Sequence, residues 1–368
     1  MKKGWEYKKL GEVANVNHGK NQKAVEDVHG KYPIYGSGGN IMGFANNYLC
    51  DAGTTILGRK GTINNPIFIE TKFWNVDTAF GISAKEGTDK KYIYYFVKSQ
   101  DWSKKDTGTT LPSLTQKVVK DTTVPVPPLS EQQRIVSYLD AAFAKIDAVA
   151  KNAEDSLNEA KALFQSALTK MMEPKEGWEE KALKMCSTKI GDGLHGTPKY
   201  DENGEYYFIN GNNLDDGKIE ISNTTKRVNI IEYNKNKVDL NENSVLLSIN
   251  GTIGKTAFYN DEKIILGKSA CYINVIPILK KEYLRYFFLS KRFLEYAKHN
   301  VRQATIMNLG LREIREMKLF IPPISTQQTI VATLDSLKSK VDQLQANLSR
   351  TLTECAALKQ SILRQTFE

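Results

Sequence analysis

The stretch PPLSEQQRIVSYLD occupies residues 127–140 of this chain, and a second version, PPISTQQTIVATLD, occupies residues 322–335. The copies start 195 residues apart (127 to 322), and the same offset aligns LFQSAL at 163–168 with LKQSIL at 358–363. A repeat of this length indicates two halves of similar structure. Each half should therefore offer a similar surface to a partner.

The repeat also has a shared beginning. The tripeptide GWE at residues 4–6 recurs at 177–179, an offset of 173 residues. Because the offset grows to 195 residues at the later copy, the interiors of the two halves differ in length as well as in sequence. We therefore expect one common frame around two divergent interiors.

Each copy of the repeated stretch should start a long helix. The prolines of residues 125–128 keep the chain extended. Ser130 with Gln133 has the form of a capping box, and Ser325 with Gln328 repeats it. The sequence therefore predicts helices that begin at about 130 and about 325.

Apolar and small residues follow an alternating spacing of four and three along both expected helices, which is a heptad pattern. In the first helix these positions are Ile135, Leu139, Ala142, Ile146, Val149, Ala153, Ser156, Ala160, Leu163 and Ala167. In the second they are Ile330, Leu334, Leu337, Val341, Leu344, Leu348, Thr351, Cys355, Leu358 and Ile362. One series is rich in alanine and the other in leucine, so large side chains can pack against small ones. This favours an antiparallel pair over two separate helices in a larger bundle.

The two interiors, about 5–123 and 178–319, have the pattern of mixed α/β domains. Short β-rich stretches such as TIL at 55–57 alternate with Gly and Asn turns. The aromatic stretches at 90–97 and 280–288 are predicted helices that pack on a sheet, in preference to stacking on bases. The predicted fold class is α+β: two mixed α/β domains separated by two long helices packed as an antiparallel coiled coil, in a pseudo-two-fold tandem repeat.

The composition favours a cytoplasmic protein with an anionic partner. Lys and Arg outnumber Asp and Glu by 51 to 42, a net charge of +9, which favours nucleic acid. The four cysteines lie far apart, so we expect neither a disulfide framework nor a zinc site. No stretch approaches the roughly 18 apolar residues of a membrane helix. Residues 1–6 are not followed by the apolar stretch of a signal peptide.

Catalytic signatures are weak. The stretch GTIGKT at 251–256 resembles the end of a phosphate-binding loop, but Ile249 occupies the place of the first glycine, which favours a tight strand turn. The stretch NPIF at 65–68 lacks the second proline of the amino-methyltransferase motif. We therefore predict no catalytic and no metal-binding residue. A stand-alone nuclease that uses Glu70 or Glu262, each two residues before a lysine, is the alternative.

Recognition of DNA remains, and the Gly-, Asn- and Lys-rich loops of the interiors suit it. Lys and Arg bind phosphate and guanine, while Asn and Gln pair with adenine edges. The candidates in the first half are Lys20, Asn21, Gln22, Lys23, Tyr35, Ser37, Asn40, Arg59, Lys60 and Thr62. The candidates in the second half are His195, Thr197, Lys199, Asn210, Asn212, Asn213, Asn250, Thr252 and Lys255. For any single residue among them, a solvated turn is the alternative.

The chain resembles the specificity (S) subunits of type I restriction-modification systems. The stretch GTTLPSLTQKVVKDTTVPVPPLSEQQRIVSYLD at 108–140, its weaker copy ending FIPPISTQQTIVATLD at 320–335, and the W-x-x-x-x-L openings carry this resemblance, which covers essentially the whole chain. The resemblance implies four segments. They are a target-recognition domain at 1–129, a spacer helix at 130–173, a second target-recognition domain at 174–324 and a second spacer helix at 325–368.

The same resemblance implies a function and partners. Each domain would read one half of a bipartite site in double-stranded DNA, while the chain holds two methyltransferase (M) subunits and the restriction (R) motor-nuclease subunits. S-adenosylmethionine, ATP and Mg would belong to those partners, with no cofactor bound by this chain and no membrane involved. A coiled-coil assembly protein without DNA binding is a further alternative.

The repeated stretches are the expected docking surface for these partners. The predicted docking residues are Glu131, Gln132, Gln133, Arg134, Gln327 and Gln328. The second copy has Thr326 and Thr329 where the first has Glu131 and Arg134, and RQATIM at 302–307 stands in place of GTTLP at 108–112. The two docking surfaces are therefore expected to differ.

Overall fold

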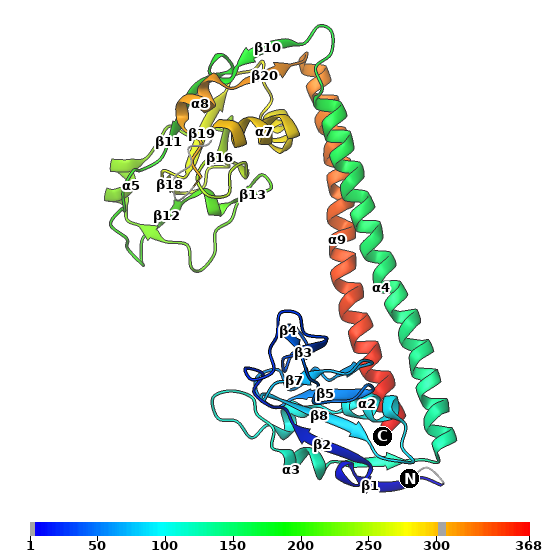
Figure 1. Cartoon of the computed structure of the whole chain (residues 1–368). Coiled ribbons are helices and arrows are strands. Elements are labelled where there is room, and N and C mark those ends of the chain that lie inside the picture. Colours follow the sequence, from blue (N-terminus) through cyan, green and yellow to red (C-terminus); the bar gives the residue numbers. More distant parts are fainter. Residues whose placement is uncertain (1–3, 301–306) are drawn as a thin grey trace. The chain divides into compact units, whose positions relative to one another are not determined.

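A computed structural model describes residues 4–300 and 307–368. The chain divides into two units, one formed by residues 1–155 with 346–368 and the other by residues 156–345. Each unit holds one mixed α/β domain and a part of each of two long helices, α4 (Leu129–Met172) and α9 (Ile324–Phe367), which are green and red in Figure 1. The predicted α+β class with its tandem repeat is confirmed.

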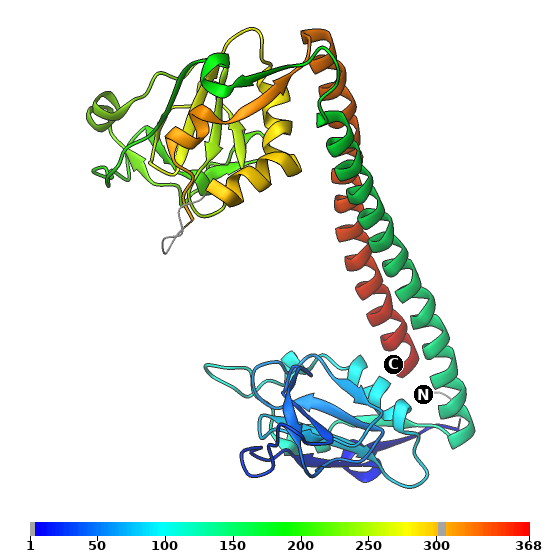
Figure 2. The same ribbon diagram turned by 45° about the horizontal axis from the view of Figure 1, so that its top comes forward.

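The first domain is built on a four-stranded antiparallel sheet with the order β2-β8-β5-β6 (Figures 1 and 2). A smaller sheet has the order β4-β3-β7, and β1 pairs with β9 where the chain enters and leaves the domain. The elements are β1 (Glu6–Lys9), α1 (Leu10–Val13), β2 (Ala14–His18), β3 (Tyr32–Tyr35), β4 (Ile41–Ala45), β5 (Thr54–Gly58), β6 (Ile67–Ile69), β7 (Trp74–Asn75), β8 (Ala79–Ala84), α2 (Lys90–Ser99), α3 (Gln116–Lys120) and β9 (Thr123–Val126).

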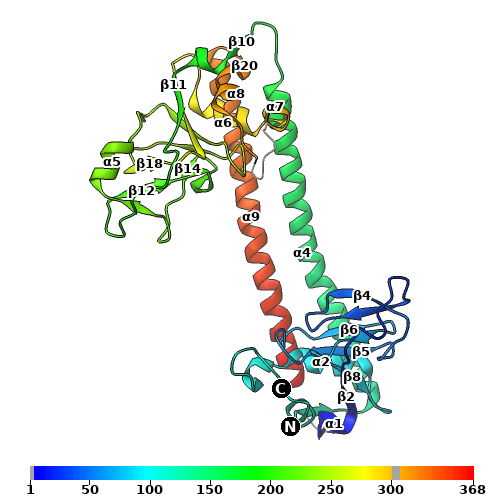
Figure 3. The ribbon, with the colours of Figure 1, turned by 60° about the vertical axis from the view of Figure 1, so that its left-hand side comes forward.

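The second domain repeats this plan with additions (Figure 3). Its sheets have the orders β11-β19-β16-β17 and β15-β12-β18, and β10 pairs with β20 as β1 does with β9. The elements are β10 (Glu179–Ala182), β11 (Ser187–Asp192), β12 (Tyr206–Ile209), β13 (Leu214–Asp215), β14 (Lys218–Ile219), β15 (Arg227–Val228), α5 (Ile230–Asn236), β16 (Ser244–Ser248), β17 (Thr256–Phe258), β18 (Ile264–Leu266), β19 (Ala270–Val275), α6 (Lys281–Leu289), α7 (Lys291–Asn300), α8 (Leu311–Glu316) and β20 (Lys318–Ile321). The common frame therefore includes the sheets as well as the long helices.

The aromatic stretches form helices that pack on the sheets, as predicted. In α2, Tyr92 and Phe96 are fully buried and belong to one hydrophobic cluster with the sheet residue Phe80. In α6, Tyr283 and Phe287 are buried in the same way. These rings fill the interior of their domains, so core packing accounts for the aromatic pattern.

Both long helices begin one residue before the predicted positions. Ser130 and Ser325 therefore lie inside the first turn, and the predicted capping boxes are wrong. Instead, the carbonyl of Pro128 accepts from the backbone N–H groups of residues 131 and 132. The proline itself ends the extended segment, so no side-chain cap before Leu129 is needed to start the helix.

A buried glutamine ties each long helix to its own domain. Gln132 donates from Nε2 to the carbonyl of Pro127 at 2.9 Å and accepts at Oε1 from the backbone N–H of Asp89 at 2.8 Å. Gln327 makes the equivalent bonds, to the carbonyl of Pro322 at 2.9 Å and from the N–H of Lys280 at 2.8 Å. A third bond runs from Gln327 to the carbonyl of residue 278 at 2.8 Å. These residues fix the start of each long helix against the start of α2 or α6.

The long helices pack together in antiparallel directions within each unit, which confirms the predicted coiled coil. In the first unit, Ile146 and Leu139 of α4 share a cluster with Leu363 of α9. In the second unit, Phe164 of α4 and Val341 of α9 line the same cavity. The start of α4 thus packs against the end of α9, and the end of α4 packs against the start of α9.

The predicted contact seam of α4 is wrong in part. Val149, Leu163 and Ser156 are exposed, the first two at 54% and 60%, whereas Leu157, Phe164 and Leu168 are buried. Burial recurs every 11 residues, at Ile135, Ile146, Leu157 and Leu168. An 11-residue repeat corresponds to about 3.67 residues per turn, whereas a heptad corresponds to 3.5, so the buried face drifts away from the heptad positions. In α9, the predicted seam residue Leu358 is exposed as well, whereas Leu363 is buried.

Among the described residues, no helix is both long and apolar enough to cross a membrane. Of the segment RQATIM at 302–307, all but Met307 lies outside the described residues.

Candidate nucleic-acid interface

The loop after β2 is anchored to the turn between β7 and β8. The backbone N–H of Gly19 donates to the carbonyl of Ala79 at 2.9 Å. A Cβ atom on Gly19 would lie 2.0 Å from the carbonyl oxygen of Val76, so this close approach requires glycine. The predicted residues that follow are exposed, except for the half-buried Gln22: Lys20, Asn21, Gln22 and Lys23.

The other two predicted loops of the first domain meet the same turn. The N–H of Val76 donates to the carbonyl of Tyr35 at 3.2 Å, and the N–H of Arg59 donates to the carbonyl of Thr78 at 2.8 Å. The guanidinium of Arg59 also donates to the carbonyl of Asp77 at 3.2 Å. Tyr35, Ser37 and Arg59 are half-buried, whereas Asn40, Lys60 and Thr62 are exposed. Residues 76–78 therefore gather three loops at one edge of the domain.

Two cationic side chains lie near His18 at this edge. His18 ends β2, and burial together with the nearby cations of Arg59 and Lys120 lowers the pKa of its imidazole. Part of this shift reflects the positive charge of two side chains near the imidazole, Arg59 and Lys120. Such an edge is suited to DNA phosphates, which attract Lys and Arg.

The second domain gathers its loops around the equivalent turn, residues 267–269. The N–H of Lys268 donates to the carbonyl of Leu194 at 3.0 Å, and the N–H of Ile249 donates to the carbonyl of Ser269 at 3.0 Å. The hydroxyl of Ser269 donates to Oδ1 of Asn210 at 2.9 Å. His195, Thr197, Lys199, Asn212 and Thr252 are exposed, whereas Asn210, Asn213 and Asn250 are half-buried. The same arrangement therefore carries unlike side chains in the two domains.

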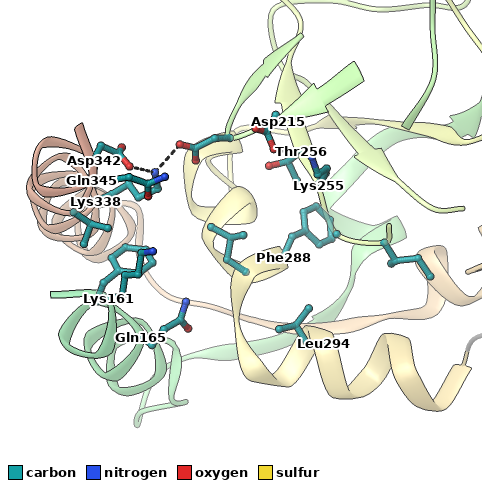
Figure 4. A pocket seen from close by; sticks show the side chains of 16 residues that line it. Lys161, Gln165, Asp215, Lys255, Thr256, Phe288, Leu294, Lys338, Asp342 and Gln345 are labelled. Atoms are coloured by element: carbon teal, nitrogen blue, oxygen red, sulfur yellow. Dashed lines mark hydrogen bonds and ion pairs between the residues drawn. The ribbon is translucent and has the colours of Figure 1, made fainter. Parts of the chain in front are cut away.

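One predicted residue does not lie with the others. The ammonium of Lys255 is 3.0 Å from the carboxylate of Asp215 and faces a cavity of about 670 Å³ (Figure 4). Phe164 of α4 and Lys338 of α9 line the same cavity. The side chain of Lys255 thus belongs to the junction between the domain and the long helices, away from the loop edge.

Two exposed cations at the loop edge were missed from the sequence. Lys268 and Arg312 line a cavity of about 400 Å³ together with His195 and Asn250. Lys268 belongs to the turn that gathers the loops, which the repeat could have revealed once the turn in the first domain was known. Arg312 comes from the short helix α8 before β20, and no sequence pattern places it beside the other residues.

The predicted docking residues divide into buried and exposed groups. Gln132 and Gln327 are buried at 1% and 0% exposure, and their amides are engaged inside their own units, so their side chains do not face a partner. Glu131 and Arg134 form a two-bond ion pair, with N–O distances of 2.7 and 2.6 Å. Gln133 and Gln328 are exposed.

The second helix start lacks this ion pair, because it has threonines at the corresponding positions. The hydroxyl of Thr329 donates to the carbonyl of Ser325 at 3.0 Å, within the helix. The first helix start therefore carries a charged pair and the second carries uncharged hydroxyl groups, and a docking role for either remains a prediction.

The weak catalytic signatures have structural explanations. The stretch 251–256 is the turn of the β16–β17 hairpin, with positive φ at Gly251 (72°) and Gly254 (99°), as predicted for a tight strand turn. Glu70 is exposed, and the carboxylate of Glu262 accepts from the N–H of Asn260 at 2.7 Å. Within residues 4–300 and 307–368, no three His, Cys, Asp or Glu side chains are grouped to hold a metal ion.

Comparison with known proteins identifies the class to which this architecture belongs. The model of the type I restriction modification DNA specificity domain matches residues 2–159 and again residues 175–354, so the chain belongs to this family. Two matches in tandem correspond to the two domains described above. The chain is therefore a DNA sequence-specificity subunit of a type I restriction-modification system.

Relatives and solved structures agree with this family. The EcoBI specificity subunit of Escherichia coli is 21% identical, over 85% of this chain and 72% of the relative. A structure solved in work on assembly and conformational transition of a type I restriction-modification system covers 100% of this chain and 98% of its own, at 20% identity and a TM-score of 0.75. The HsdS subunit from Thermoanaerobacter tengcongensis has a TM-score of 0.55 at 19% identity and covers 100% of this chain and 97% of its own. At these identities, the structures support the fold.

Proposed function

We propose that this chain reads a bipartite site in double-stranded DNA, with one half-site bound by the loop edge of each domain. The observation that carries the proposal is the repeated loop edge. The turn at residues 76–78 and its counterpart at 267–269 gather three loops each, and these loops present unlike polar side chains. Equal frames with unlike loops suit a protein that reads two different half-sites.

The same chain would be a scaffold without catalytic activity of its own. Two methyltransferase subunits would dock on the two helix starts, near Glu131 and Arg134 in the first copy and Gln328 in the second, and the motor-nuclease subunits would join them. S-adenosylmethionine, ATP and Mg would be bound by those partners. Its place would be the cytoplasm, where these partners meet DNA.

Methylation mapping tests the proposal directly. The chain is co-expressed with the methyltransferase of its own system in a host without other adenine methylation, and methylated adenines are mapped across the genome. The expected result is a single motif made of two half-sites with a fixed spacing. A continuous motif, or methylation without any motif, would contradict it.

Exchanging one interior tests the assignment of half-sites to domains. Replacement of residues 5–123 by the interior of another specificity subunit should change one half-site and leave the other unchanged. A change in both half-sites would contradict the modular assignment.

Two measurements on the purified chain test the alternatives. Incubation with plasmid and Mg should leave the plasmid intact, whereas cleavage would favour a nuclease that uses Glu70 or Glu262. Binding to duplex DNA should weaken steeply with salt because phosphate contacts release counterions. A coiled-coil assembly protein without DNA binding would show no such dependence.

A further inference from the structure

The second domain has a cavity of about 400 Å³ within its loop edge. Four separate segments line it, and seven of the lining residues are polar: Asp192, His195, Asn250, Lys268, Asn308, Arg312 and Glu313. Backbone bonds hold these segments together, because the N–H of Leu309 donates to the carbonyl of Ile249 at 2.9 Å and the N–H of Gly251 donates to the carbonyl of Met307 at 3.0 Å. The hydroxyl of Tyr296 fixes α8 through the carbonyl of Glu313 at 2.8 Å.

Two oxygens of this cavity are buried and have no hydrogen-bond partner within residues 4–300 and 307–368. They are Oδ1 of Asn250 and Oε2 of Glu313. Asp192 supplies the second carboxylate of the cavity, and this one has a partner, since its Oδ2 is 2.7 Å from Nε2 of His195. Leaving a buried acceptor unpaired is unfavourable, and such groups in native proteins call for an explanation such as a bound ligand.

The rim of the cavity has the opposite character. His195, Lys268 and Arg312 are exposed and carry donors toward solvent. Exposed cations around a recessed pair of acceptors suit a duplex, because the phosphates lie outside the groove and the base edges lie within it. The cavity therefore has the chemistry to position a DNA strand and to accept a hydrogen bond from one of its bases.

We propose that Glu313 and Asn250 read an amino group on a base of the second half-site, which restricts one position on one strand to adenine or cytosine. In the major groove, adenine N6 and cytosine N4 donate, whereas guanine O6 and thymine O4 accept. A carboxylate oxygen and an amide oxygen can accept a hydrogen bond from the amino group of adenine or cytosine. Beside the acceptor oxygen of guanine or thymine they are unfavourable. This inference rests on the proposed DNA-reading function and adds the class of base that the site takes.

The test uses the full chain in complex with its methyltransferase subunits. Methylation is mapped for the wild type, E313M, N250L and N250D, and binding is compared for duplexes that differ at one position of the second half-site. E313M and N250L, which remove the acceptor, should reduce the preference for adenine or cytosine at one position by about 10- to 100-fold, and N250D, which keeps the acceptor, should preserve it. E316M is the matched control, because Glu316 also lies in α8 but is paired with Lys184 at 2.7 Å and does not line the cavity.

Each other outcome decides against the inference. An unchanged motif in E313M and N250L, a change in the first half-site, or a wild-type motif with guanine or thymine at the affected position would overturn it. Complete loss of methylation in both variants would also overturn it, since one lost base contact does not abolish binding. If the wild-type complex methylates no bipartite motif, the proposed function fails instead.

Discussion

The two units attach their domains to the long helices in the same way. They differ at two aligned positions of the repeat, where a phenylalanine and a lysine have changed places between the helices. In the first unit, Phe143 of α4 is buried and the ammonium of Lys359 of α9 lies 5.3 Å from the centre of its ring. The offset of 195 residues places Lys338 of α9 at the position of Phe143, and Phe164 of α4 at the position of Lys359. In both units, therefore, α4 supplies the aromatic ring and α9 supplies the lysine.

The surroundings of the exchanged residues are conserved between the units. Lys359 pairs with Asp147 in the first unit, and Lys338 pairs with the equivalent Asp342 in the second, at 2.5 Å (Figure 4). Lys338 also binds Asp216 at 2.7 Å. The comparison shows that a pseudo-symmetric frame can be maintained by equal pairs of residues in opposite order, and that α4 and α9 are not interchangeable.

The largest expected effect comes from breaking the pair in the first unit. F143K would place a second ammonium beside Lys359 in a mostly buried position and remove a buried ring, at a cost of about 3–5 kcal/mol in unfolding free energy. F143K/K359F recreates the order found in the second unit and should recover most of this loss. Urea unfolding of the full chain checks both, and a double variant as unstable as F143K would contradict the equivalence of the two pairs.

Loss of the buried glutamines should have the next largest effect. Q132L removes two hydrogen bonds and Q327L removes three, and each leaves buried backbone groups unpaired. We expect a loss of about 2–4 kcal/mol for each, with Q327L at the upper end. The exposed neighbours are matched controls, and Q133A and Q328A should stay within about 0.5 kcal/mol of the wild type. Thermal unfolding that separates these two pairs of variants is the measurement.

The buried tyrosines predict the same pH dependence for both units. Burial raises the pKa of Tyr92 in the first unit and of Tyr283 in the second above the ordinary value of about 10. The unfolded chain releases the phenolic proton at a lower pH than the folded chain does. The free energy of unfolding is therefore undiminished by these tyrosines below about pH 10 and falls as the pH rises above it. The slope approaches about 1.4 kcal/mol per pH unit for each tyrosine, and Y92F or Y283F should remove one such contribution. The free energy of unfolding is measured at pH 8 and pH 11 for the wild type, Y92F and Y283F. If only one of the two variants reduced its dependence on pH, the two units would not be equivalent.

The smallest effect should come from the lysines alone. K359M and K338M remove ion pairs whose lysine side chains are 23% and 24% exposed, and each should cost about 1 kcal/mol or less. K338M should be the more sensitive to salt, since Lys338 has two carboxylate partners. Unfolding at low and high NaCl distinguishes them, and equal salt dependence would mean that Asp216 contributes nothing.

The frame was predictable from the sequence because it is repeated and because its prolines fix where the helices start. The contact seam of α4 was predicted only in part, since a heptad and an 11-residue repeat agree near Ile135 and Ile146 and diverge toward Leu163 and Phe164. The fate of Gln132 could not be predicted, because its burial depends on α2, more than 30 residues earlier in the chain.

The loop residues were predictable by type but not by neighbourhood. Gly, Asn and Lys mark the loops after β2, β5, β11 and β16, and most of the predicted residues meet at the two loop edges. The side chain of Lys255 lies away from the loop edge, because the β16–β17 hairpin directs it toward the long helices. Lys268 and Arg312 reach the edge from elements distant in sequence, a relation that only the fold supplies.

Some of the bonds that attach the domains to the frame are made to main-chain atoms. Gln132 and Gln327 accept from the N–H groups of Asp89 and Lys280, and Tyr92 and Tyr283 donate to the carbonyls of Pro125 and Phe320, at 2.8 and 3.0 Å. The side chains at these equivalent positions are unlike, yet the bonds are the same. Such bonds place no demand on the side chain of the residue that supplies the main-chain atom, whereas the bonds of Tyr95 to Asp140 and of Tyr286 to Asp335 require a tyrosine in each interior. A foreign interior that keeps the tyrosines of α2 or α6 could therefore be joined to the same long helices by recombination in a single event, with these bonds intact.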